Sequence, residues 1–343
     1  MSTRASAKKR KRQNKKKKTL LWLFLLALIT ALGILVFFLL QRISLSETVS
    51  PYSIENTFST DTSEIEYQSL GGFAENLCVG SDGVLLPNVS LEDTQTGGLF
   101  NLKDKSIVYS KGIYDKVYPA SITKLMTAIL ALKYGNLEDM VTISQSAVTL
   151  ESGSQVAGFS AGDQVSMDAL LQCLLVYSGN DAAAAIAEHI GGTQEQFVAM
   201  MNEEAKTLGM TQTSFTNPHG LHDDNHYTSV YDIYLMLNEA MSYSRFLEII
   251  QQGSYTVHYT RADGTARETT LPSTDRYLTG EATAPKGVTV LGGKTGTTDQ
   301  AGSCLSLISQ NSYGDFYISI VLNASSKDQL YEQMNSLLST INS

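Results

Sequence analysis

The sequence has 343 residues, of which 43% are hydrophobic and 17% are charged, and its formal net charge is −9. This length and composition can bury a sizeable core in one large domain or two smaller ones, which excludes a disordered chain and a small disulfide-built domain. The charge is segregated, because residues 1–18 hold ten lysines and arginines and no acid, while the rest of the chain holds 15 basic and 34 acidic residues.

The basic run by itself is compatible with a nucleic-acid-binding arm. It is followed, however, by an uncharged apolar stretch from Leu20 to Leu40 that is long enough to cross a bilayer as a helix. A cleaved signal peptide would have a shorter apolar region that ends at a small-x-small site, and a helix of a soluble core would have a polar face. We therefore predict a basic cytoplasmic tail at 1–18, a transmembrane signal-anchor helix at 19–40 and no nucleic-acid partner. The rest of the chain then lies outside the cell membrane, which it crosses once.

Residues 41 to about 70 are rich in serine, threonine, glutamate and asparagine, which is typical of a flexible stalk. We place a stalk or linker at 41–92 and the folded domain at 93–343. The domain opens with two β-prone runs around a Lys-Asp-Lys turn, at 97–110, which predict a hairpin. The three cysteines match no disulfide framework or metal site by number or spacing. Cys173 and Cys304 are expected to be small buried apolar residues, and Cys78 is left without a role.

The middle of the chain, from Pro119 to about Gly253, has helical patterns. Apolar residues recur through 121–134 at spacings that predict a helix buried on most sides, which ends before Gly135. A second helix is predicted at 166–176 and a third at 181–190, with a break at Ser178-Gly179-Asn180 between them.

The C-terminal part returns to strands, predicted at 288–296, 302–309 and 316–323, and Ser326 caps a last amphipathic helix. Strands at both ends with helices between them predict one sheet built from distant segments. The expected fold class is therefore α/β (α+β), with an antiparallel sheet completed by the N- and C-terminal segments, flanked by helices and carrying a helical subdomain.

Ser121 and Lys124 are three residues apart at the start of a predicted helix, so their side chains project from the same face. A serine nucleophile needs a neighbour that accepts its proton, and a lysine can do so when burial or a second cation lowers its pKa. The spacing alone is a weak signal, because Ser6 and Lys9 share it in the basic tail, and a helix cap followed by an exposed lysine fits it equally.

Two further elements strengthen this hypothesis. Ser178 and Asn180 stand at a helix break, where side chains can point into a cleft, although an ordinary polar turn has the same composition. Lys294-Thr295-Gly296 follows two glycines on an apolar strand, and glycines there allow close approach of another backbone. A phosphate-binding loop is the alternative for this segment, but its first glycine would fall on residue 288, which is valine.

The chain resembles penicillin-binding serine peptidases and class A β-lactamases in three motifs that occur in the same order. These motifs are Ser121-x-x-Lys124, Ser178-x-Asn180 and Lys294-Thr295-Gly296. The segments around them, 118–127, 177–183 and 215–221, are similar to those of low-molecular-mass D-alanyl-D-alanine carboxypeptidases. The resemblance covers about residues 95–343 and implies a β-lactamase/DD-peptidase-like fold.

The resemblance also implies a role for each motif residue. Ser121 would attack the carbonyl between two terminal D-alanines of a peptidoglycan stem peptide, Lys124 would accept its proton and Ser178 would relay a proton to the leaving amine. The remaining positions would bind substrate: Asn180, Lys294, Thr295, Gly296 and Thr297, with the backbone N–H groups of Ser121 and Thr297 as the oxyanion hole. No cofactor or metal is implied, and β-lactams would acylate the same serine.

Relatives commonly carry an arginine shortly after the last strand that helps to bind the substrate carboxylate. Residues 323–333 of this chain contain no arginine, and their only basic residue is Lys327. A zinc site is an alternative for His219, His222 and His226 together with two aspartates. The stretch is rich in turn formers, however, which favours loop-capping roles for these side chains.

A β-lactamase would need a glutamate that activates water for deacylation, and no glutamate occurs around residue 213. A non-catalytic penicillin-binding module is the other alternative, which three intact motifs disfavour.

Overall fold

The computed structural model describes residues 74–342. Its centre is a five-stranded antiparallel sheet with the strand order β2-β1-β9-β8-β7. The strands are β1 (Thr96–Asn101), β2 (Ser106–Lys111), β7 (Thr289–Thr298), β8 (Gly302–Gln310) and β9 (Phe316–Ala324). The N-terminal hairpin joins the C-terminal strands because β1 pairs with β9, with Thr96 opposite Leu322. The predicted hairpin, the three C-terminal strands and the sheet built from distant segments are confirmed.

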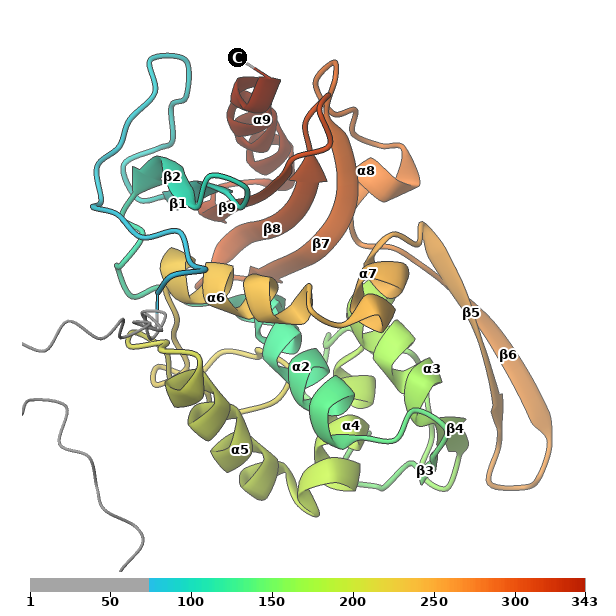
Figure 1. Ribbon diagram of the computed structural model, residues 1–343. Helices are drawn as coiled ribbons and strands as arrows, with labels where there is room; N and C mark the ends of the chain where they lie inside the picture. The colour runs from blue at the N-terminus through green and yellow to red at the C-terminus, as the bar shows by residue number, and fades with distance from the viewer. Residues whose placement is uncertain (1–73, 343) are drawn as a thin grey trace, which may run out of the picture. The chain divides into compact units, whose positions relative to one another are not determined.

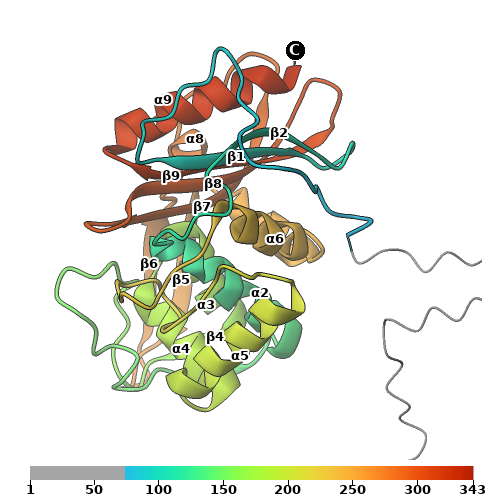
Figure 2. The same cartoon turned by 90° about the vertical axis from the view of Figure 1, so that its left-hand side faces the viewer.

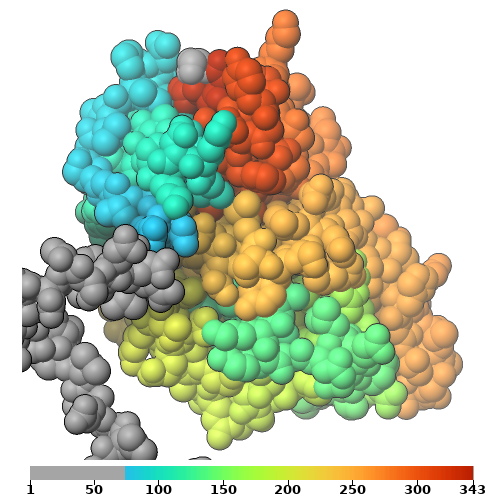
Figure 3. Space-filling view, viewed as in Figure 1, coloured from blue at the N-terminus to red at the C-terminus, as the bar shows by residue number. Residues whose placement is uncertain are grey.

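Helices cover both faces of this sheet (Figures 1 and 2). The C-terminal helix α9 (Lys327–Leu338), capped by Ser326 as predicted, packs on one face, and α6 (Val230–Ala240) lies against the other. Side chains alternate along a strand, so Leu305 and Leu307 of β8 face α9 while Ile308 belongs to the core on the α6 side. In the space-filling view the N-terminal hairpin and the C-terminal helix lie side by side (Figure 3).

The helical region lies on the α6 side of the sheet, with α2 (Lys124–Tyr134) at its centre. Eight consecutive residues of α2, Lys124 to Ala131, are buried, which confirms the prediction of a helix buried on most sides. A single 3₁₀ turn, η1 (Ala120–Thr123), precedes it. The other helical elements are α3 (Met167–Gln172), the π-helical turn η2 (Cys173–Tyr177), α4 (Asn180–Gly191), α5 (Gln194–Thr207), α7 (Ser244–Ile250), α8 (Arg276–Thr279) and the 3₁₀ turn η3 (Ser339–Asn342).

A second antiparallel sheet, absent from the sequence prediction, has the order β3-β4-β5-β6. Its strands are β3 (Met140–Thr142), β4 (Gln164–Ser166), β5 (Ser254–Thr260) and β6 (Ala266–Pro272). The long β5–β6 hairpin extends along the outer side of the helical region (Figure 1). Most of its side chains are partly or fully exposed, so it lacks the apolar run by which the central strands were recognised.

The segment before β1 packs on the domain, which corrects the predicted end of the stalk at residue 92. Cys78 is buried, its backbone N–H donates to Tyr234 Oη at 2.8 Å, and Val89 and Leu91 join the core beneath α9. The folded domain therefore already includes Cys78, because these apolar side chains complete its core. The predicted tail at 1–18, anchor at 19–40 and first part of the stalk lie outside the described residues. Within 74–342, no helix has the length and apolar character needed to cross a bilayer.

Candidate active site

Ser121 lies in the 3₁₀ turn that leads into α2, so its side chain stands one turn from that of Lys124. Ala120, just before it, has a φ of 47°, in the left-handed region that L residues seldom adopt. Gly220 packs directly on this turn, and a Cβ at Gly220 would come within 1.9 Å of the Ala120 carbonyl oxygen. The surrounding backbone thus holds the turn in a conformation that it would rarely adopt alone.

Lys124 Nζ has three hydrogen-bond partners, at 2.8 Å for Ser121 Oγ, 2.6 Å for Asn180 Oδ1 and 2.7 Å for the His219 carbonyl oxygen. The side chain is completely buried. Burial, and then the positive charge of Lys294, hold the pKa of Lys124 well below its usual value, against an opposing effect of Asp181. Both effects favour the neutral amine, which is the form that can accept the proton of Ser121.

Ser178 and Lys294 form a second pair across the cleft. Ser178 follows the π-helical turn η2 and has a φ of 72°, which turns its side chain out of the helix direction. Lys294 Nζ donates to Ser178 Oγ and to the Thr295 carbonyl oxygen, each at 2.9 Å. Burial lowers the pKa of Lys294 to about 7, and the buried carboxylate of Asp275 acts in the opposite direction.

Strand β7 passes unusually close to the turn that carries Ser121. A Cβ on Gly296 would lie 2.9 Å from Ser121 N and 3.0 Å from both Ala120 Cβ and the Pro119 carbonyl oxygen. Only glycine leaves room for this approach. The next residue, Thr297, lines the same space as Ser121.

These segments enclose a cleft of about 390 Å³. Of the eight predicted site residues, six line the cleft: Ser121, Ser178, Asn180, Thr295, Gly296 and Thr297. Lys124 and Lys294 lie beneath its floor and reach it through their hydrogen bonds to Ser121 and Ser178. The structure thus brings all eight residues together.

Several residues of the cleft were not identified from the sequence. Thr274 accepts a hydrogen bond from Thr295 Oγ1 at 2.6 Å, and Arg276 lines the cleft together with Lys327. Arg276 pairs with Asp328 at 2.6 Å. The polar residues 273–276 were the sequence feature that could have indicated these cleft residues, but they have no fixed spacing from any of the three motifs.

Asp181 was also missed, although it directly follows Asn180. Its carboxylate accepts hydrogen bonds from the backbone N–H groups of Ala157, Gly158 and Phe159 at 2.8–3.3 Å. It thereby fastens the 153–159 segment, whose Gln155 lines the cleft, to the start of α4. Such a role depends on a loop more than twenty residues away, so no local pattern marks it.

The histidine-rich loop has internal hydrogen bonds. His226 Nε2 lies 2.8 Å from Thr123 Oγ1, and His226 Nδ1 accepts from the Thr216 N–H at 3.1 Å. Burial lowers the pKa of His226 to about 4 and that of His219 to about 3, so both rings are neutral near pH 7. Among residues 74–342 no group of three or more histidine, cysteine or acidic side chains is placed to hold a metal ion. Cys173 and Cys304 are buried and free, as predicted.

Comparison with known proteins places these features in a family. A family model described as D-alanyl-D-alanine carboxypeptidase matches residues 96–326. The D-alanyl-D-alanine carboxypeptidase DacF of Bacillus subtilis is 34% identical over 238 residues, which cover 68% of this chain and 58% of that protein. The chain thus spans little more than half the length of this curated relative.

Solved structures agree. The Streptomyces K15 DD-transpeptidase superimposes with a TM-score of 0.65 at 26% identity, over 70% of this chain and 94% of that one. The D-alanyl-D-alanine carboxypeptidase DacD of Francisella tularensis gives a TM-score of 0.63 at 26% identity, over 76% of this chain and 73% of that one. The predicted DD-peptidase-like fold is confirmed, and this chain belongs to the D-alanyl-D-alanine carboxypeptidase family.

Proposed function

We propose that the chain is a serine-type D-alanyl-D-alanine carboxypeptidase, which removes the terminal D-alanine of peptidoglycan stem peptides through an acyl-enzyme on Ser121. The environment of Lys124 Nζ is the observation that carries this proposal. A neutral amine has two N–H bonds and one lone pair. Two of its three partners, Asn180 Oδ1 and the His219 carbonyl oxygen, are acceptors only and would take both N–H bonds of the neutral amine. Its lone pair would then face the Ser121 hydroxyl, 2.8 Å away.

In the proposed reaction, Lys124 takes the proton of Ser121 as Oγ attacks the carbonyl carbon between the two D-alanines. The backbone N–H groups of Ser121 and Thr297 stabilise the oxyanion, a type of contact worth about 3–4 kcal/mol. The intermediate collapses with cleavage of the C–N bond, and Ser178 relays a proton to the leaving amine. Water then attacks the ester and releases the shortened peptide.

Lys294 has two roles in this proposal. Its charge keeps the pKa of Lys124 low, and its hydrogen bond orients Ser178 for proton transfer. Asn180 uses Oδ1 for Lys124, which leaves its amide N–H bonds for a carbonyl oxygen of the substrate.

The terminal carboxylate of the substrate is assigned to the Thr295 side of the cleft. Thr295 Oγ1 would transfer its donated hydrogen bond from Thr274 to the carboxylate, and Arg276 and Lys327, which line the same cleft, supply positive charge there. These two residues compensate for the arginine that relatives commonly carry after the last strand.

β-Lactams would acylate Ser121 in the same way, and deacylation would be slow. Among the described residues that line the cleft, Glu281 is the only carboxylate, and it lies 3.7 Å from Arg276, so no acid in the lining stands ready to activate water beside Ser121. This arrangement favours a penicillin-sensitive peptidase over a β-lactamase.

The proposal extends to the location of the enzyme. An apolar segment at 19–40 preceded by ten basic residues supports a single-pass anchor with its N-terminus in the cytoplasm. The catalytic domain would then face the cell wall, where the stem peptides are found.

The test uses the purified full-length chain and the neutral peptide diacetyl-Lys-D-Ala-D-Ala, with the Ser121→Ala variant as the matched control. The unmodified enzyme should release D-alanine and bind fluorescent penicillin covalently, and the variant should do neither. Equal release by both proteins would refute Ser121 as the nucleophile. Penicillin binding without any release would favour a non-catalytic penicillin-binding module, and nitrocefin turnover above about one per second would favour a β-lactamase.

A further inference from the structure

Asp275 is a buried carboxylate beside the cleft, and no step of the proposed reaction uses it. It is 3% exposed and stands between two residues that line the cleft, Thr274 and Arg276. Its Oδ1 accepts the Tyr277 N–H at 3.0 Å and the Tyr331 hydroxyl at 3.4 Å. Its Oδ2 is buried and has no hydrogen-bond partner among residues 74–342. Such an arrangement is costly unless an opposite charge nearby compensates for it.

The segment that carries Asp275 is joined to strand β7 next to Lys294. Thr295 Oγ1 donates to Thr274 Oγ1 at 2.6 Å. Each of these threonines directly neighbours one of the two charged residues in the sequence, so the two charges lie close together. Burial raises the pKa of Asp275 to about 6, and the positive charge of Lys294 is among the effects that oppose this rise. The charge of Asp275 in turn opposes the fall in pKa that burial causes at Lys294.

The other polar groups around Asp275 do not neutralise it. Arg276 directs its guanidinium to Asp328 on α9, at 2.6 Å, and the side chain of Asp328 is 89% exposed. Burial raises the pKa of Tyr277 on α8 and of Tyr331 on α9, so both phenols are uncharged. The buried cation that faces Asp275 is therefore Lys294.

A role as a helix cap does not by itself explain this carboxylate. Asp275 is the N-cap of α8, and it caps the helix through Oδ1. Serine or asparagine would cap this four-residue helix about as well, without a buried charge. A buried charge is strongly unfavourable when it lacks a counter-ion. The negative charge, rather than the cap, is therefore the feature that needs a partner.

We propose that Asp275 is the counter-ion of Lys294, a positioning residue that keeps Lys294 protonated during acylation. The inference rests on the proposed function. Asp275 acts only through Lys294, which donates to Ser178 Oγ at 2.9 Å and whose charge lowers the pKa of Lys124 on α2. Asp181 on α4 acts on Lys124 in the opposite direction. Without the charge of Asp275, Lys294 would lose its proton at a lower pH, and both of its effects would be lost with it.

The test is the pH profile of acylation by fluorescent penicillin, measured on the full-length Asp275→Asn variant. Asparagine keeps the shape of the side chain and the Oδ1 acceptor, and it removes the charge. The alkaline limb of the profile should move to lower pH by about one unit, because that limb reports the loss of the Lys294 proton. At pH 8 the variant should therefore be acylated about tenfold more slowly than the unmodified enzyme. At pH 5.5 the two rates should converge, because Asp275, whose pKa is about 6, is then largely protonated in the unmodified enzyme.

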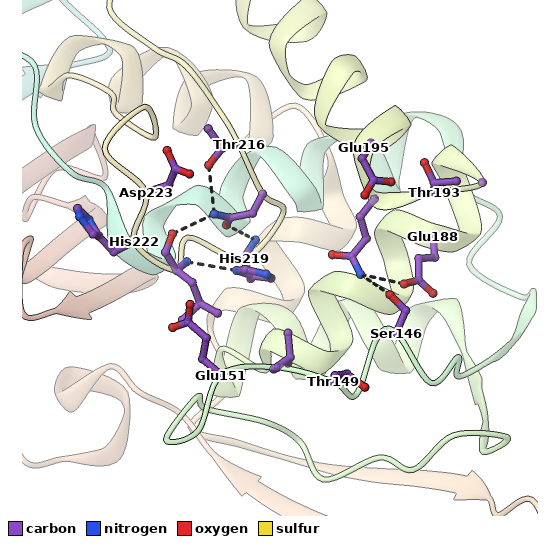
Figure 4. A pocket seen from close by; sticks show the side chains of 15 residues that line it. Ser146, Thr149, Glu151, Glu188, Thr193, Glu195, Thr216, His219, His222 and Asp223 are labelled. Atoms are coloured by element: carbon purple, nitrogen blue, oxygen red, sulfur yellow. Dashed lines mark hydrogen bonds between the residues drawn. The ribbon is translucent and has the colours of Figure 1, made fainter.

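Two further variants complete the test. Asp275→Ser should show the same shift, because serine also caps a helix and carries no charge. Glu188→Gln is the matched control and should keep the original profile. Glu188 is likewise held by hydrogen bonds, from Ser144 and Gln194, but it lines another hollow, of about 740 Å³, and not the cleft (Figure 4).

The ratio of the rates at pH 8 and pH 5.5 within one protein cancels any general loss of activity. An alkaline limb that moves by less than about 0.3 pH units in both Asp275 variants would overturn the assignment and leave the proposed function intact. A shift of equal size in Glu188→Gln would overturn it as well. Failure of penicillin to acylate the unmodified enzyme would instead refute the proposed function.

Discussion

The close approach of β7 to the nucleophile turn predicts the effect of Gly296→Ala. The added Cβ would lie 2.9–3.0 Å from three atoms of residues 119–121, whereas ordinary contacts begin at about 3.4 Å. Two of these atoms are backbone atoms, so β7 and the turn must separate by roughly 0.5 Å. Since a 1 Å misplacement costs about 100-fold, we expect acylation by fluorescent penicillin to slow by about 10- to 100-fold. Overpacking should cost about 1–3 kcal/mol and lower Tm by roughly 2–10 °C.

The assay measures the second-order acylation rate in stopped flow, and Tm is measured on the same samples. Gly80→Ala is the matched control, because its Cβ would meet only the flexible Ile107 side chain, at 3.2 Å, and it lies outside the cleft lining. A Gly296→Ala protein that acylates within threefold of the unmodified rate would contradict the expectation that separating β7 from the turn of Ser121 slows acylation.

Three further predictions follow from the charges of the site. Acylation should rise with pH as Lys124 loses its proton, and it should fall as Lys294, whose pKa is about 7, loses its proton. The pH profile should therefore be bell-shaped, with its optimum near or below pH 7. A rate that still rises above pH 8 would contradict these roles. Arg276→Ala should raise KM for diacetyl-Lys-D-Ala-D-Ala about tenfold with a smaller change in kcat, and an unchanged KM would remove this residue from carboxylate binding. Asp181→Ala leaves three loop N–H groups without their acceptor. Urea denaturation should therefore show a free energy of unfolding that is lower by about 3 kcal/mol. A decrease below 1 kcal/mol would show that other contacts hold the loop.

Local patterns in the sequence were sufficient for much of the domain. The hairpin at 97–110, the buried helix after Ser121 and the C-terminal strands and helix are each set by side-chain periodicity and turn residues within about ten positions. The second sheet was missed because the exposed β5–β6 hairpin has little apolar alternation. The start of the folded domain was misplaced because the burial of Cys78, Val89 and Leu91 depends on partners far along the chain, such as Tyr234, 156 residues from Cys78.

The sequence by itself determined which residue types carry the chemistry and in what order, because Ser121-x-x-Lys124, Ser178-x-Asn180 and Lys294-Thr295-Gly296 are short-range patterns. Only the tertiary structure decided that they act as one site. Lys124 meets Asn180 across 56 residues, and Lys294 meets Ser178 across 116. The lowered pKa of both lysines comes first from burial by these distant segments. Desolvation and the distance between charges are properties of the packed interior, so no reading of neighbouring residues can supply them.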